Sequence, residues 1–169
     1  MHIQRSHARG RRTAVAAACL LIPAVAPATP AEAHALGFFG RHSHAHSAAR
    51  VLDLVNEERW RAGCGPLVLD RRLSESARRH SGDMAYWHHI SHRGSDGTAP
   101  VDRIRRTGFR AKAWGENVAS GYRTADQVMD AWMASPGHRE NILNCRYKRM
   151  GIAHAEPGDY WTQDFAAPR

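Results

Sequence analysis

Two histidines and one glutamate are the residues of this chain whose types and surroundings could do chemistry together. His92 lies in the turn-forming stretch SHRGSDGT, His138 follows Ser-Pro-Gly, and Glu116 lies in Gly-Glu-Asn. All three read as loop positions, and sites tend to be built on loops held by a rigid scaffold. Two imidazoles and a carboxylate could bind a divalent cation such as Zn²⁺ in an open site. They could equally form an acid–base pair in which the glutamate orients a histidine.

The remaining histidines of the second half have simpler interpretations. His80 falls on the apolar stripe of a predicted helix and is expected in the core or at its boundary. His88, His89 and His154 are expected at a helix end or on a strand face, and Asp96 is expected to form a turn. No pair has the i, i+4 spacing of a helical zinc motif, so spacing alone is a weak signal for a metal.

Helical patterns come first along the chain and paired strand patterns come last. Helices are predicted at residues 51–62, 70–84, 100–107 and 124–135, with a short helical turn at 141–143. Strands are predicted at 150–155 and 160–165, and 114–121 reads as a loop or short strand. Arg59 and its charged neighbours are expected on the polar faces of the first helix. This order predicts an α+β domain with helices packed on a small antiparallel sheet.

The first 33 residues have the pattern of a secretory signal peptide. Arginines at positions 5 to 12 precede an apolar stretch over residues 14–28, and Ala31-Glu32-Ala33 offers a small-residue cleavage site. The stretch is short and rich in proline, whereas a membrane span needs about 20 apolar residues. We therefore predict export by the Sec or twin-arginine route, cleavage after Ala33 and no transmembrane segment in the mature chain.

The mature chain is predicted to be a histidine-rich flexible arm, residues 34–49, followed by one folded domain, residues 50–167. His42, His44 and His46 of the arm could bind a transition metal, although a solvated linker is the simpler interpretation. The net charge of +8 comes from scattered arginines without interleaved aromatics, so nucleic-acid binding is not indicated.

Two cysteines, Cys64 and Cys145, remain after the predicted cleavage. Lone cysteines of an exported protein usually pair, because its environment is oxidising. We therefore expect a disulfide that ties the end of the first helix to the segment that follows His138.

Several stretches in order resemble the bacterial branch of the CAP superfamily, which also holds cysteine-rich secretory proteins, insect venom antigens and plant pathogenesis-related proteins. They are VNEERWRAGCGPLVLD, HSGDMA, ISHRGSDGTAPVDRIRRTGF, WGENVASG, AWMASPGHRENILN, MGIAHA and YWTQDF. The similarity runs from about Val51 to Phe165, nearly all of the predicted domain. It implies an α-β-α sandwich with a central cleft lined by two histidines and two acidic residues.

Carried over to this sequence, the cleft residues are His92, Glu116 and His138, with Asn117 beside them. The position of the second acidic residue is Ser135, and Glu140 is not taken as its substitute. Serine is a poor ligand for Zn²⁺ or Mg²⁺, so a metal held here would be bound weakly or keep open positions.

The resemblance implies a secreted protein, expected as a monomer, that binds a small ligand, a lipid or a cell-wall component in this cleft. Zn²⁺ or another divalent cation could take part through His92, His138 and Glu116. The alternative is an extracellular hydrolase or protease, in which Ser135 and His138 supply the nucleophile and the base. Both stay open, because a fold does not fix a function.

Overall fold

The computed structural model describes residues 47–169, so the predicted signal peptide and most of the predicted arm lie outside the described residues. The chain is helical over residues 47–61. The elements that follow are β1 (Val68–Leu69), α2 (Arg71–Trp87), α3 (Pro100–Arg106), β2 (Ala111–Ala119), α4 (Ala125–Ala134), α5 (Pro136–Ile142), β3 (Arg149–Ala155) and β4 (Tyr160–Pro168). Among the described helices, none is long and apolar enough to cross a membrane.

The four strands form one sheet in the order β1-β3-β4-β2. The three longer strands pair antiparallel, as predicted, while the two-residue β1 runs parallel to β3. The sheet is therefore mixed rather than purely antiparallel. Strand β2 lies at the edge opposite β1. At this edge, side chains from the helices on both faces of the sheet can come together.

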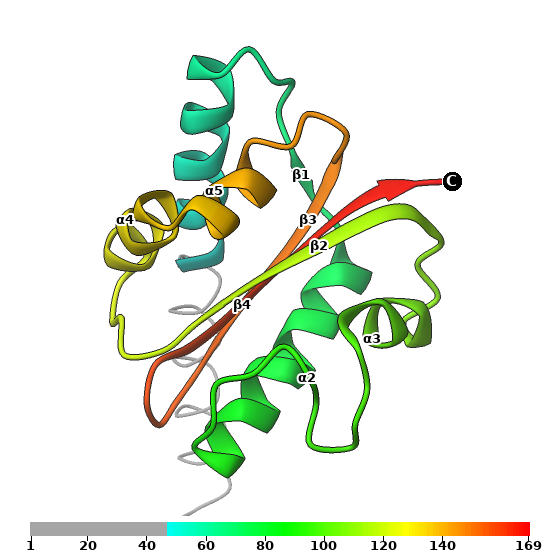
Figure 1. Ribbon diagram of the computed structural model, residues 1–169, viewed down its shortest axis with the longest axis vertical. Helices are drawn as coiled ribbons and strands as arrows, with labels where there is room; N and C mark the ends of the chain where they lie inside the picture. The colour runs from blue at the N-terminus through cyan, green and yellow to red at the C-terminus, as the bar shows by residue number, and fades with distance from the viewer. Residues whose placement is uncertain (1–46) are drawn as a thin grey trace, which may run out of the picture.

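Helices cover both faces of the sheet, which confirms the predicted α+β sandwich (Figure 1). On one face, Leu73 of α2 and Ile104 of α3 pack against Ala166 of β4. On the other, Val55 of the first helix and Trp132 of α4 join the largest apolar cluster with strand residues. Alternate residues of each central strand therefore enter different halves of the core.

Local signals in the sequence explain where several helices begin and end. The carboxylate of Asp70 accepts a hydrogen bond from the backbone N–H of Arg72, which confirms Asp70 as the predicted N-cap of α2. Gly108 follows α3 with φ +81°, a conformation that glycine adopts without steric cost. Pro136 opens α5 directly after α4, since a proline at the first helical position has no N–H that the helix would need.

The first helix is tied to the end of α5 by a disulfide and by an arginine. Cys64 and Cys145 are bonded, with their Cα atoms 4.9 Å apart, as predicted. Arg59 was expected on a polar face but is fully buried. Its guanidinium donates to the carbonyls of Gly65, Ile142, Asn144 and Tyr147. Burial lowers the pKa of Arg59, and these carbonyls provide the polar contacts that the buried charge requires.

Candidate functional site

His92 and Glu116, two of the predicted cleft residues, are in direct contact. His92 lies in the segment after α2, and its Nδ1 is 2.8 Å from Oε1 of Glu116. A carboxylate can only accept, so Nδ1 carries the proton and Nε2 is left to meet a ligand. The side chain of His92 is 56% exposed and that of Glu116 only 1%. A buried carboxylate thus holds an exposed imidazole in one orientation.

Glu116 itself lies in a strand, so of the two alternatives for residues 114–121 the strand is confirmed and the loop position of Glu116 was wrong. It belongs to β2, and its second carboxylate oxygen accepts from Nη2 of Arg103 on α3. Arg103 is nearly buried and also donates to the carbonyl of Thr98 at 3.0 Å. Glu116 is therefore fixed between the guanidinium of Arg103 and the ring of His92. The hydrogen bond from His92 to Glu116 raises the pKa of His92, and the partial burial of His92 opposes this rise.

Asp164 is a second acid at this position of the sheet, and it was not among the predicted site residues. It is the register partner of Glu116 on β4 and is completely buried. Burial raises the pKa of Asp164 well above its ordinary value, and the neighbouring charge of Glu116 adds to the rise. Both effects favour the protonated form of Asp164, because two adjacent buried carboxylates repel each other. The available signal was a lone acid inside the otherwise uncharged strand pattern YWTQDF.

His138 lies in the first turn of α5 rather than in a Pro-Gly loop. The loop prediction was wrong because Pro136 starts a helix instead of prolonging a break. Partial burial lowers the pKa of His138, and the nearby charge of His92 lowers it further. The charge of His92, in the segment between α2 and α3, thus influences His138 on α5.

The side chain of Asn117 links β2 to α5 by hydrogen bonds. Its side chain is fully buried, and Nδ2 donates at 3.1 Å to the backbone carbonyl of His138 and to Gln163. Its Oδ1 accepts from Nδ2 of Asn141 at 2.9 Å, and the same amide group of Asn141 donates to the carbonyl of Glu116. Asn117 therefore positions His138 and leaves no amide group turned toward a ligand.

His80 is buried, as predicted, and it supports the segment that carries His92. It is 1% exposed, and its Nε2 is 2.7 Å from the carbonyl oxygen of Ser91. Burial lowers the pKa of His80, so its ring is neutral and donates to that carbonyl. Asp96 forms the predicted turn, accepting from the backbone N–H and hydroxyl of Thr98.

The donor set at His92, Glu116 and His138 fits a resident metal poorly. Both oxygens of Glu116 are occupied by His92 and Arg103, and Ser135 stands where a second acid would be needed. Within residues 47–169, the possible ligand atoms of these three side chains do not all lie within 4.8 Å of one another. Glu116 instead matches the carboxylate that orients a functional histidine from behind.

Comparison with known proteins identifies the family to which this arrangement belongs. Residues 52–165 match the model of the CAP family, described as the cysteine-rich secretory protein family. Because the match covers most of the chain, the protein belongs to this family.

Relatives and solved structures agree with this assignment. The chain is 40% identical over 116 residues to the uncharacterized protein YkwD of Bacillus subtilis (strain 168), and 31% identical over 119 residues to the uncharacterized membrane protein YlbC of the same organism. These matches cover 69% and 70% of this chain but only 45% and 34% of those proteins.

Two solved structures are similar over most of the described domain. An extracellular protein with an SCP domain from Bacillus anthracis str. Ames superposes with a TM-score of 0.70 at 25% identity, covering 84% of this chain and 45% of that one. An outer surface protein from Borrelia burgdorferi gives a TM-score of 0.64 at 24% identity, covering 68% of this chain and 87% of that one. The second likeness supports the fold alone.

Proposed function

We propose that the protein is an exported binding module that holds an anionic group of its ligand between His92 and His138. The observation that carries this proposal is the buried Arg103–Glu116 pair, which fixes the exposed ring of His92 with Nε2 directed away from Glu116. Export is supported by the signal-peptide pattern, by the Cys64–Cys145 disulfide and by the extracellular SCP-domain relative.

The rings of His92 and His138 differ in how readily they take up a second proton. The pKa of His92 is raised and that of His138 is lowered, so near neutral pH one ring more readily presents a cation and the other a neutral imidazole. A phosphate or carboxylate oxygen suits the first ring, and a neighbouring hydroxyl suits the second. Phosphate-bearing wall polymers and lipid headgroups both offer this combination.

The hydrolase alternative gains no support from the geometry. Ser135 connects α4 to α5, and no hydrogen bond joins its hydroxyl to His92 or His138 in the described structure. A serine nucleophile needs a base within hydrogen-bond reach. Binding is therefore the function that the described residues support best.

Glycerol 3-phosphate is a suitable first probe, because it carries the chemistry shared by wall polymers and lipid headgroups. We expect its addition to the full chain to shift the ring NMR signals of His92 and His138 together. His92→Gln should abolish the shift, whereas His89→Gln, at an exposed position after α2, should not. Unchanged signals in the wild-type chain, or a shift that survives in His92→Gln, would contradict the proposal. Vesicles of phosphatidylglycerol then distinguish a lipid from a soluble polymer.

A further inference from the structure

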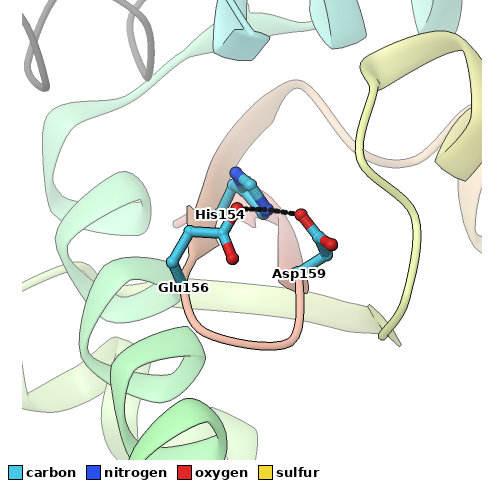
Figure 2. A group of neighbouring side chains, drawn as sticks. All are labelled: His154, Glu156 and Asp159. Carbon is cyan, nitrogen blue, oxygen red and sulfur yellow. Dashed lines mark hydrogen bonds and ion pairs between the residues drawn. The ribbon is translucent and has the colours of Figure 1, made fainter.

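Three side chains that can bind a metal converge on the hairpin between β3 and β4 (Figure 2). His154 lies near the end of β3, Glu156 lies in the turn, and Asp159 lies just before β4. Nε2 of His154 is 3.1 Å from Oδ1 of Asp159 and 3.8 Å from Oε1 of Glu156. One ligand atom of each residue lies within 4.8 Å of the other two. His154 was predicted to be only a strand-face residue.

The hairpin holds two of these side chains in place without a metal. The imidazole of His154 stacks on the indole of its register partner Trp161, with ring centroids 4.3 Å apart and planes 19° apart. The indole N–H of Trp161 in turn donates to the carbonyl of Tyr122 at 2.6 Å. Asp159 has a left-handed backbone, with φ +52°, which turns its side chain at the start of β4. The side chains of His154 and Asp159 are only 11% and 16% exposed.

The spacing suits metal coordination. Ligand atoms about 2.0–2.2 Å from a tetrahedral zinc ion are about 3.3–3.6 Å from one another. The two measured separations, 3.1 and 3.8 Å, lie on either side of this range. Glu156 is 62% exposed, so its side chain is free to close the longer gap.

The ligand types indicate which ion would be preferred. One imidazole nitrogen and two carboxylate oxygens are common zinc ligands, whereas Ca²⁺ and Mg²⁺ take oxygen ligands. Two carboxylates also balance the charge of a divalent cation. Without a metal, Nε2 of His154 can donate a hydrogen bond to Oδ1 of Asp159, whereas Oε1 of Glu156, at 3.8 Å, is too far away for a second hydrogen bond.

We propose that the β3–β4 hairpin is a zinc site formed by Nε2 of His154 and by carboxylate oxygens of Glu156 and Asp159. Three protein ligands leave a fourth position open for water or for a group from another molecule. The site is separate from the His92–His138 pair, because Trp161 belongs to the apolar cluster beneath the first helix and α4, whereas Glu116 faces α3. Whether the hairpin binds zinc is therefore independent of the proposed binding function of His92 and His138.

Zinc titration of the full chain, followed by the NMR signals of the His154 ring and the Trp161 indole N–H, tests the proposal. Both signals should change to saturation in the wild-type chain. Asp159→Asn should weaken this response by at least about tenfold, the scale seen for altered metal shells. Glu156→Gln should weaken it as well, and because Glu156 is exposed this variant should keep the fold.

Two control variants separate this site from the others. His92→Gln should leave the response of the His154 and Trp161 signals unchanged, and so should His89→Gln. Equal saturation in wild type, Asp159→Asn and Glu156→Gln would overturn the proposal. A zinc response confined to other histidines, with the hairpin signals unmoved, would also overturn it. Since phosphate binding is read at His92 and zinc binding at His154, failure of one assay does not mimic failure of the other.

Discussion

Replacing Glu116 by glutamine should show how much the buried negative charge of this residue contributes to the stability of the fold. The change keeps the shape of the side chain but removes the negative charge between Arg103 and His92. Removing one partner of a buried ion pair typically costs about 3–5 kcal/mol, because the other charge stays buried without compensation. Arg103 is 8% exposed and would be that charge.

Asp164 determines whether the full cost is observed. Its carboxyl lies beside Glu116, and the charge of Arg103 already favours its ionisation. Once Glu116 is replaced by a neutral side chain, its repulsion is removed, so the pKa of Asp164 should fall and the Asp164 carboxylate can partly replace the lost charge. We therefore expect Glu116→Gln to cost about 2–3 kcal/mol of unfolding free energy at pH 7, below the uncompensated range. The double variant Glu116→Gln/Asp164→Asn should cost more than the sum of the two single changes.

The same change has a defined pH dependence through His92. Glu116 raises the folded-state pKa of His92 above its unfolded value, so this contact stabilises the wild type at low pH and is lost as the pH rises through the folded pKa. The His92 contribution to the penalty of Glu116→Gln should therefore be larger at about pH 5.5 than at about pH 8, and the pKa of His92 should fall.

Urea unfolding followed by tryptophan fluorescence at both pH values measures the stability, and ring NMR signals report the pKa of His92. Glu140→Gln is the matched control, since Glu140 is an exposed acid on α5. Unfolding of Glu116→Gln at the same urea concentration as this control, or an unchanged pKa of His92, would contradict the role given to the buried charge of Glu116.

Three further changes test the scaffold. Gly151→Ala should lower the free energy of unfolding by about 1–3 kcal/mol in urea unfolding, because the new Cβ would lie 2.1 Å from the backbone carbonyl carbon of Leu73. Stability equal to wild type would contradict the close approach of α2 and β3. Arg59→Met should cost about 3 kcal/mol or more by the same measurement, since buried carbonyls lose their donors, and a near-neutral result would show that water replaces the guanidinium. Reducing the Cys64–Cys145 bond, which joins positions 81 residues apart, should lower the unfolding free energy by up to about 4–5 kcal/mol on the chain-entropy model; an unchanged urea midpoint with reductant would contradict this.

The sequence predicted the elements well where a local signal defines them. Asp70 caps a helix because its side chain reaches a backbone N–H two residues on, and that contact depends on local sequence alone. Gly108 ends α3 for a similarly local reason. The pairing of the last two strands followed from the turn formers between them.

The errors arose where tertiary contacts override local preference. Gly-Glu-Asn was interpreted as part of a loop, but Glu116 is kept in an edge strand by partners on α3 and after α2. Arg59 sits among charged helix residues, and only the distant carbonyls near α5 explain why it is buried. Asp164 gains its environment from the strand register, which no local pattern defines. His92, Glu116 and His138 were selected mainly by family resemblance, and their contacts could not be read from spacing.

We propose that His92 and His138 form one site, with His92 held by the buried carboxylate of Glu116. The most direct test is a pH titration of the ring NMR signals of both histidines in the full chain and in His92→Gln. We expect His92 to titrate above the ordinary histidine pKa of about 6.5 and His138 below it, and we expect the pKa of His138 to rise in His92→Gln. Two rings that titrate alike, with His138 indifferent to the loss of His92, would contradict the account.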